Sequence, residues 1–168
     1  ADTMHLELIE RMLASGRAYA VLAHLDALPA RDREAPHAQW LRAEALRQVQ
    51  DHAAATQLYE SLVNGPYVGL AHRGLGLVAS AQGQSDTALR HLEIARGLLP
   101  TDSRVRNDLG YAYLLDGDIA RARTELLTAL ELDPQAATVT ANFLLLLHAT
   151  GDVQAATLCA QRRNIPAV

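Results

Sequence analysis

The clearest pattern in the sequence lies in residues 103–136, SRVRNDLGYAYLLDGDIARARTELLTALELDPQA. Apolar residues recur at helical spacing on both sides of Asp116-Gly117-Asp118, and they are Leu109, Ala112, Tyr113, Ile119, Ala122, Leu126, Leu127 and Leu130. Gly117 tolerates a positive φ angle, and Asp118 can cap a helix that begins after it. Asp133-Pro134 ends the second run of apolar residues. The stretch therefore predicts two helices joined by a tight turn.

The same arrangement occurs 34 residues earlier in the chain. Pro100 corresponds to Pro134, and the turn glycine Gly83 corresponds to Gly117. The offset also relates Leu75-Gly76 to Leu109-Gly110, Ala88 to Ala122, Leu92 to Leu126 and Ala95 to Ala129. A 34-residue period with these small and apolar positions resembles the tetratricopeptide-repeat (TPR) family. The resemblance implies two helices in each repeat, crossing closely where Gly110 and Ala122 leave room.

Weaker matches extend the resemblance over the whole chain as five hairpins, at approximately 1–35, 36–68, 69–102, 103–136 and 137–168. Pro36 begins the second hairpin, Asn64-Gly65-Pro66 forms the turn that follows it, and residues 30–36 form a polar connector. About three stacked repeats are enough for a stable solenoid. We therefore expect one all-α domain over residues 1–168, a right-handed superhelical solenoid of about five TPR-like helical hairpins.

Composition and charge narrow the classes of function. The chain is 49% hydrophobic but only 4% aromatic, which suits a core of alanine and leucine between helices. Its net charge of −4 argues against free nucleic acid as a partner. The longest apolar run, residues 143–147, is too short to cross a bilayer. All 15 basic residues are arginines, and together with the many alanines this usage indicates a bacterial source.

The sequence shows no constellation for catalysis. It has no nucleophile motif, phosphate-binding loop or dinucleotide fingerprint. The histidines are scattered, mostly one in each expected helix, and no ligand-spaced pair has a third ligand on the same face. They are His5, His24, His37, His52, His72, His91 and His148. We therefore predict a protein that is not an enzyme, with no metal site and no cofactor.

In TPR proteins the first helix of each pair lines a concave groove, so the resemblance implies a binding site there. Carried over to this sequence, the groove residues are Trp40, Arg73, Leu77, Arg104, Asn107, Tyr111, Leu114, Leu115, Leu145 and His148. They predict an apolar and aromatic floor that suits a protein or peptide segment with apolar anchors. Two alternatives stay open. Trp40 could be a half-buried core aromatic, and Leu77, Leu115 and Leu145 could pack only between repeats.

One known mode of TPR binding is disfavoured. TPR modules that grip the C-terminal carboxylate of chaperones use lysine and asparagine at set groove positions. This chain contains no lysine. Arg73 and Asn107 stand at one clamp-like position, but Leu77 and Tyr111 replace the asparagine expected one turn later.

Residues 107–118, NDLGYAYLLDGD, followed by Asn142, an apolar run and Gly151-Asp152, also resemble the TPR lipoprotein of bacterial tight-adherence (Tad/Flp) pilus assembly. Related TPR pilotins help an outer-membrane secretin to localise or assemble. The resemblance implies a protein on the periplasmic side of the cell envelope that holds a pilus or secretin subunit. Its lipid-bearing cysteine, and with it any membrane contact, would lie outside the 168 residues.

We therefore expect a non-catalytic TPR adaptor that binds a protein segment in its concave groove and assists assembly of a bacterial pilus or secretion apparatus. Two alternatives belong to other classes of protein. One is a cytoplasmic TPR chaperone for secreted translocator proteins, and the other is a TPR domain cut from a larger enzyme. Self-association through the terminal hairpins also stays open.

Overall fold

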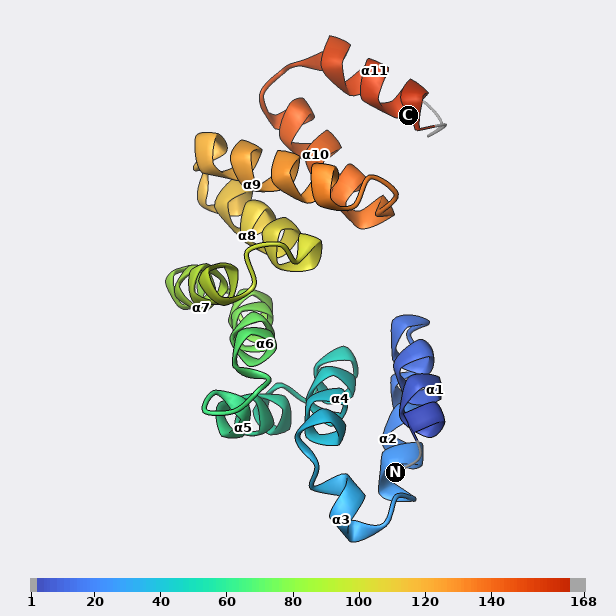
Figure 1. Ribbon diagram of the computed structural model, residues 1–168. Helices are drawn as coiled ribbons and strands as arrows, with labels where there is room; N and C mark the ends of the chain where they lie inside the picture. Colours follow the sequence, from blue (N-terminus) through green and yellow to red (C-terminus); the bar gives the residue numbers. More distant parts are fainter. Residues whose placement is uncertain (1–2, 164–168) are drawn as a thin grey trace. The chain divides into compact units, whose positions relative to one another are not determined.

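The computed structural model describes residues 3–163, and within this range every regular element is a helix (Figure 1). The chain divides into two compact units, unit 1 (Ala1–Leu98) and unit 2 (Leu99–Val168). Unit 1 contains α1 (Thr3–Ala14), α2 (Ala18–Asp26), α3 (Ala30–Arg33), α4 (Pro36–Gln48), α5 (His52–Leu62), α6 (Val68–Ala81) and α7 (Ser85–Leu98). Unit 2 contains α8 (Ser103–Asp116), α9 (Ile119–Leu132), α10 (Ala137–Ala149) and α11 (Val153–Arg162). The all-α fold of about five helical hairpins is thus confirmed, and their organisation as a single domain stays a prediction.

Consecutive helices pack in pairs. The pairs are α1 with α2, α4 with α5 and α6 with α7 in unit 1, and α8 with α9 and α10 with α11 in unit 2. Pro36 begins α4 as expected, because its fixed φ and missing N–H suit the first position of a helix. No helix among residues 3–163 has the length and the apolar character needed to cross a membrane.

The polar connector expected at residues 30–36 contains one helical turn. Residues 30–33, predicted as part of a polar connector, form the short helix α3. Pro29 precedes the helix with φ −53°, and its carbonyl accepts hydrogen bonds from the amides of Asp32 (2.9 Å) and Arg33 (3.0 Å). The fixed φ of proline therefore starts a single helical turn in a segment without buried residues. The turn predicted at residues 64–66 is confirmed, since the Gly65 amide donates to the Leu62 carbonyl at 3.2 Å.

The turn inside a pair has a recurring geometry. A residue with positive φ ends the first helix, and four glycines with φ between 72° and 84° take this position: Gly16, Gly83, Gly117 and Gly151. The side chains of Asp51, Asp118 and Asp152 each accept a hydrogen bond from the amide three residues later. The cap predicted at Asp118 is thereby confirmed, with its Oδ1 3.0 Å from the Arg121 amide nitrogen.

The turn of the second pair carries a strained residue. Gln50 has φ 66°, where the other turns have glycine, and among residues 3–163 no other non-glycine residue has a positive φ. The left-handed conformation costs an L-residue about 1–2 kcal/mol. This cost exceeds the free energy that glycine loses on folding through its larger conformational entropy in the unfolded chain. We expect Gln50→Gly to raise the free energy of unfolding by about 0.5–1 kcal/mol in urea denaturation.

Gln57 offers the matched control for this substitution. It is exposed within α5, so Gln57→Gly makes the same chemical change in an ordinary helical conformation. That variant should lose about 0.5–1 kcal/mol, because glycine is a poor helix former. If Gln50→Gly were as destabilising as Gln57→Gly, the strain at residue 50 would not be real.

The two pairs with the strongest repeat signal cross at a glycine. A Cβ atom at Gly76 of α6 would lie 2.7 Å from Leu92 Cγ of α7, and one at Gly110 of α8 would lie 2.7 Å from Leu126 Cγ of α9. Packed carbon atoms do not approach so closely, so only glycine permits these helices to cross where they do. The close crossing expected at Gly110 is therefore confirmed, and it recurs one repeat earlier.

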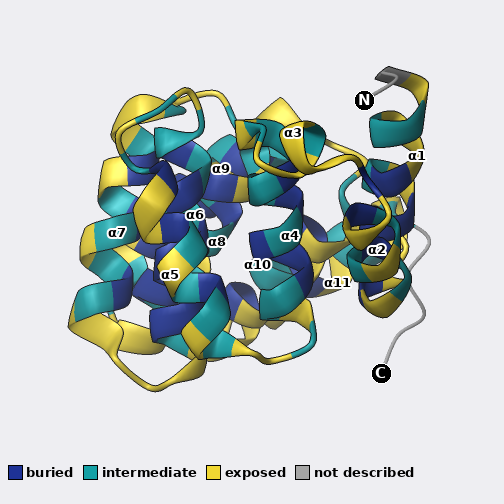
Figure 2. Cartoon of the chain, turned by 90° about the horizontal axis from the view of Figure 1, so that it is seen from below, coloured by how far each residue is buried: buried dark blue, intermediate teal, exposed yellow. Residues whose placement is uncertain are grey.

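The buried residues lie between the helices of each unit (Figure 2). Unit 1 has two clusters, one that includes Ile9, Leu25 and Leu41 and another that includes Tyr59, Ala71 and Leu75. The fully buried large side chains of unit 2 are Val105, Leu109, Leu126, Leu146 and Leu147. The helix surfaces left outside these cores are what each unit can offer to a partner.

Candidate functional site

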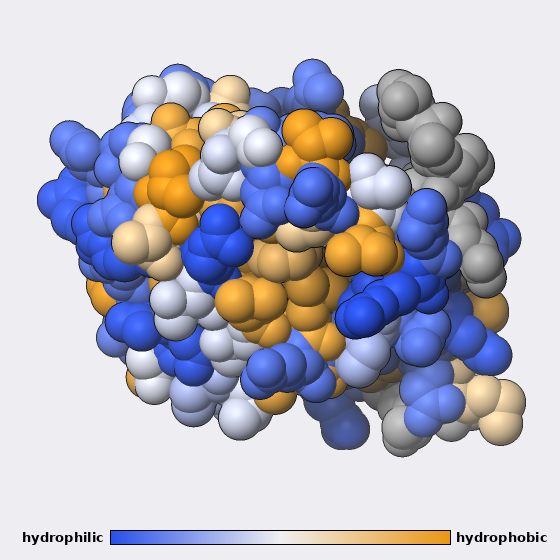
Figure 3. Space-filling view, turned by 90° about the horizontal axis from the view of Figure 1, so that it is seen from above, coloured by the Kyte–Doolittle hydropathy of each residue, from blue (hydrophilic) through white to orange (hydrophobic). Residues whose placement is uncertain are grey.

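Each of the four helices of unit 2 exposes at least one large apolar side chain, and those of α8 and α10 lie on adjacent helices. Tyr111 and Leu115 of α8 are 37% and 63% exposed, and Leu145 of α10 is 51% exposed. Helices α8 and α10 pack against each other, and Leu145 occupies the repeat position of Tyr111, 34 residues later. These three residues define the α8–α10 face. Figure 3 shows that apolar side chains are exposed among polar ones on the surface of the molecule.

An amide pair joins α8 to α10 beneath this face. Asn142 Nδ2 donates a hydrogen bond to Asn107 Oδ1 at 2.9 Å, and Asn107 is only 4% exposed. Asn107 Nδ2 in turn lies 3.4 Å from Asp108 Oδ1. A buried side chain whose polar atoms are bonded within the unit fixes the spacing of the two helices. Asn107 therefore supports the face. Leu114, another predicted groove residue on α8, is half-buried.

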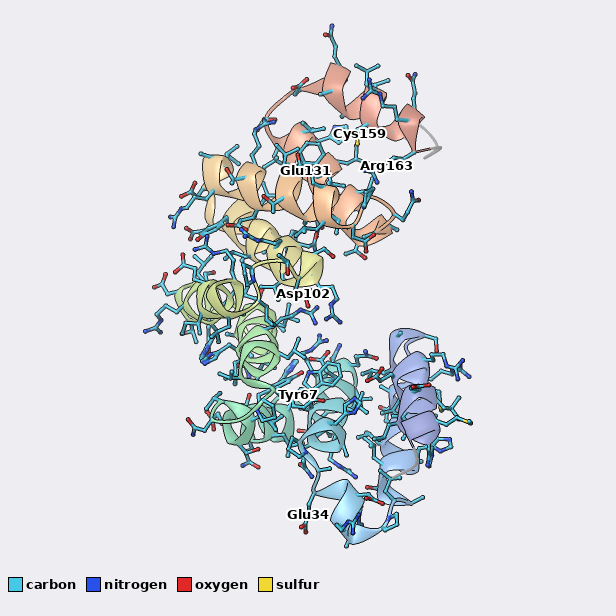
Figure 4. All side chains as sticks on the ribbon, viewed as in Figure 1. Glu34, Tyr67, Asp102, Glu131, Cys159 and Arg163 are labelled. Carbon is cyan, nitrogen blue, oxygen red and sulfur yellow. The ribbon has the colours of Figure 1, made fainter. Side chains whose placement is uncertain are left out.

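Arg104 lies at the beginning of α8, where Asp102 caps the helix (Figure 4). Asp102 Oδ2 accepts from Arg104 Nη2 at 2.7 Å, and Asp102 Oδ1 accepts from the Arg104 amide at 2.9 Å. Burial opposes ionisation of Asp102, but the hydrogen bonds and charge of Arg104 outweigh burial and lower the pKa of the carboxyl group. The exposed guanidinium group is thus held at one end of α8, and exposed His148 lies in the last turn of α10.

Trp40 of unit 1 is a half-buried aromatic that packs against both buried clusters of that unit. Its ring stacks on Tyr67 at 5.7 Å between centroids and on His37 at 6.0 Å (Tyr67 is labelled in Figure 4). His37 Nε2 is 2.5 Å from Glu10 Oε1, so the stack also reaches α1. Trp40 Nε1 is buried and has no hydrogen-bond partner among residues 3–163.

A buried polar network lies between α4 and α5. Glu44 is 5% exposed, and its Oε1 accepts from the Tyr59 hydroxyl at 2.6 Å. Its Oε2 accepts from Arg47 Nη2 at 2.9 Å. Burial opposes ionisation of Glu44, but the charges of Arg47 and Arg73, with hydrogen bonds from Tyr59 and Arg47, outweigh burial and lower its pKa. Arg73, a predicted groove residue, therefore acts electrostatically on this network, and Leu77 one turn later is half-buried.

The lowered pKa of Glu44 predicts a dependence of stability on pH. A carboxyl group whose pKa is lower when folded contributes stability above its ordinary pKa of 4.5, and the contribution is lost as pH falls through the folded pKa. We expect the stability difference between wild type and Glu44→Gln to be constant above about pH 5.5 and to shrink below about pH 4.5. Urea denaturation between pH 7 and pH 3 measures this difference. A difference that stays constant down to pH 3 would contradict the assignment.

The predicted groove residues thus fall into two sets. Trp40, Arg73 and Leu77 belong to unit 1, and the other seven belong to unit 2. Within unit 2, α8 and α10 bring together the exposed apolar residues Tyr111, Leu115 and Leu145. A continuous groove through both sets stays a prediction.

Sequence reasoning missed two kinds of contact between helices. The hydrogen bond from the Tyr59 hydroxyl to Glu44 cannot be predicted from the repeat pattern, because nothing in the pattern marks a carboxylate 15 residues away as the partner of the hydroxyl. Four histidines also form pairs across helices, His5 with His24 and His72 with His91. Ligand spacing within a single helix does not reveal such pairs. Within residues 3–163, no group of three or more His, Cys, Asp or Glu side chains could hold a metal ion.

Comparisons with known proteins agree with the repeat pattern. A family model of the tetratricopeptide repeat matches residues 73–137. A TPR repeat-containing protein of Pseudomonas aeruginosa, PA4299, is 36% identical over 164 residues, which is 98% of this chain and 65% of the relative. The chain thus spans less than two thirds of that relative's length.

Solved structures share the fold at low sequence identity. TTC0263, a thermophilic TPR protein of Thermus thermophilus, superposes with a TM-score of 0.84 at 20% identity, over 97% of this chain and 90% of that one. The pilF protein of Pseudomonas aeruginosa superposes with a TM-score of 0.75 at 18% identity, over 96% of this chain and 74% of that one. The repeat period, the paired helices and these similarities lead to one conclusion: residues 73–137 are tetratricopeptide repeats, and the chain has the fold of TPR proteins.

Proposed function

We propose that this protein is a non-catalytic TPR adaptor that binds a protein segment on its α8–α10 face. The observation that carries the proposal is the exposure of Tyr111, Leu115 and Leu145, between 37% and 63%, on two helices that pack together. Adjacent apolar side chains left outside a core mark sites of interaction with other proteins. TPR proteins are interaction modules, and this face is one of the apolar surfaces that the described part of unit 2 offers.

The residues of the face indicate the chemistry of the partner. Tyr111 and Leu115 are four residues apart on one helix, and Leu145 lies on the neighbouring helix, so they form a short apolar surface. A helical segment with apolar residues three or four apart, or an extended segment with alternating apolar residues, can cover such a surface. The tyrosine ring adds contact area at a low cost in conformational entropy, and its hydroxyl can bond the partner backbone. The proposed partner is therefore a protein segment with two or three apolar anchors.

The cellular role that we propose is assistance in assembling a bacterial pilus or secretion apparatus. The support for this role is the resemblance of residues 107–118 to the Tad pilus TPR lipoprotein. In this role the α8–α10 face holds a segment of a pilus or secretin subunit until assembly. The proposed location is the periplasmic side of the cell envelope.

A pull-down from envelope and soluble extracts of the source bacterium, analysed by mass spectrometry, tests this role. It compares wild type with the double variant Tyr111→Arg, Leu115→Arg. The matched control is Ile94→Arg, Leu98→Arg on α7, which replaces two apolar residues that are also four apart and are 45% and 49% exposed. Circular dichroism establishes beforehand that both variants are folded.

We expect pilus or secretin subunits with wild type and with the α7 control, and their loss with the double variant on α8. Capture of secreted translocator proteins from the soluble extract instead would favour the cytoplasmic chaperone and overturn the envelope role. Equal capture of one partner by all three proteins would place the binding site elsewhere on the chain.

A further inference from the structure

The TPR repeat brings two side chains into contact at one defined position of the hairpin. In the pair α8–α9, Arg106 Nη1 is 2.8 Å from Glu125 Oε2. In the pair α6–α7, at positions 34 residues earlier, His72 Nδ1 is 3.0 Å from His91 Nδ1. In the pair α1–α2, His5 and His24 take the same positions, with Nε2 and Nδ1 3.4 Å apart. The two residues are 19 apart in every case, so their contact is a property of the repeat.

The contact between His72 and His91 is held in place by the crossing of α6 and α7. His72 lies one turn before Gly76, and His91 is adjacent to Leu92, the residue that Gly76 packs against. Because the helices approach so closely there, neither imidazole needs an extended conformation to reach the other. The ring centroids are 5.2 Å apart with an interplanar angle of 31°.

This separation of nitrogens matches two ligands of a single metal ion. A metal–nitrogen distance of about 2.0–2.1 Å places cis ligands about 2.9 Å apart in octahedral geometry and about 3.3 Å apart in tetrahedral geometry. The observed 3.0 Å lies between these values. Both side chains are half-buried, so solvent can reach the pair and supply the remaining ligands.

Two charged side chains act on the pair. Glu60 of α5 carries a negative charge that favours a cation near His91, and Arg90, which precedes His91 on α7, carries a positive charge that opposes it.

We propose that His72 and His91 form a two-histidine site for a divalent transition-metal ion such as Zn²⁺, with water completing its coordination. Imidazole nitrogens suit zinc, copper and nickel. Bound there, the ion joins α6 to α7 at their crossing and stabilises that hairpin of unit 1. Sequence analysis did not single out this pair, because the two histidines lie on different helices, 19 residues apart.

Isothermal titration of metal-stripped protein with ZnCl₂ tests the site. All proteins carry His24→Gln, so that the equivalent pair of the first hairpin is removed. To this parent we add His72→Gln, His91→Gln or, as the matched control, His148→Gln, which removes an exposed histidine outside the pair. We expect the parent and the His148→Gln control to bind one Zn²⁺ with equal affinity. Either variant of the pair should bind Zn²⁺ at least about tenfold more weakly than the parent.

Thermal unfolding gives a second measurement. Excess Zn²⁺ should raise the Tm of the parent and of the His148→Gln control, and chelation should reverse the rise, because a ligand that binds the folded state stabilises it. Neither variant of the pair should respond in this way, and each is checked for folding by circular dichroism. A Zn²⁺ affinity and Tm shift that survive both His72→Gln and His91→Gln would overturn the proposal. So would a parent protein that binds no Zn²⁺ at neutral pH.

Discussion

Gly74→Ala is expected to lower the free energy of unfolding by about 2–4 kcal/mol. A Cβ atom at Gly74 would lie 2.2–2.6 Å from three atoms of the Tyr59 ring. Tyr59 has no exposed surface, and its hydroxyl is bonded to Glu44 at 2.6 Å, so the ring cannot move aside without breaking that bond. The cost of overpacking thus adds to that of a lost buried hydrogen bond, and the higher helix propensity of alanine offsets only part of it.

Urea denaturation followed by circular dichroism measures the change, with Gly97→Ala as the matched control. Gly97 is an exposed glycine of α7, and a Cβ atom there would meet nothing within 4 Å. We expect Gly97→Ala to be neutral or to stabilise by up to about 1 kcal/mol, since alanine reduces the entropy of the unfolded chain. Equal stabilities of the two variants would show that the Tyr59 ring does not pack against Gly74.

Glu44→Ala is expected to destabilise the protein by about 3–5 kcal/mol. The substitution removes the acceptor of two hydrogen bonds, from the Tyr59 hydroxyl and from Arg47 Nη2. Arg47 is left largely buried without the charge that compensates its own, and its Nε already lacks a hydrogen-bond partner among residues 3–163. Removing one member of a buried ion pair costs far more than the pair itself contributes, because the remaining charge stays desolvated.

The exposed ion pair Arg42–Asp26 provides the comparison in the same unit. Asp26 Oδ1 is 2.6 Å from Arg42 Nη2, but its side chain is 65% exposed. Asp26→Ala should therefore change the free energy of unfolding by no more than about 1 kcal/mol, although the two distances to arginine are similar. Chemical denaturation of Glu44→Ala and Asp26→Ala in parallel measures the two changes in the free energy of unfolding. If both lost the same small amount, Glu44 would not be functioning as a buried ion-paired residue.

Much of the fold could be predicted from residues that the repeat determines locally. Gly117 and Asp118 indicated a turn and a cap because their chemistry acts within a few residues. Gly110 indicated the helix crossing, since a small residue at a fixed repeat position implies a close approach. The connector at residues 30–33 was missed as a helix because a single turn has no hydrophobic periodicity to detect.

The candidate site was harder to predict for a physical reason. A 34-residue period tells which face of a helix a residue occupies, but it does not tell how deeply neighbouring helices bury that residue. Asn107 and Tyr111 are one turn apart on α8, yet Asn107 is 4% exposed and bonded to Asn142, whereas Tyr111 is 37% exposed. Contacts such as Tyr59 with Glu44 depend on side-chain length and rotamer, which the period does not encode.

The central claim is that the exposed apolar residues of α8 and α10 bind a protein segment. The most direct test selects peptides from a random library on the wild-type protein and measures their Kd by fluorescence anisotropy. We predict that peptides with apolar anchors bind at least about tenfold more weakly to Tyr111→Arg, Leu115→Arg, since burying an unpaired arginine costs more than about 1.4 kcal/mol. The control Ile94→Arg, Leu98→Arg should retain the wild-type Kd. Wild-type affinity in the α8 variant, or an equal loss in the α7 control, would contradict the claim.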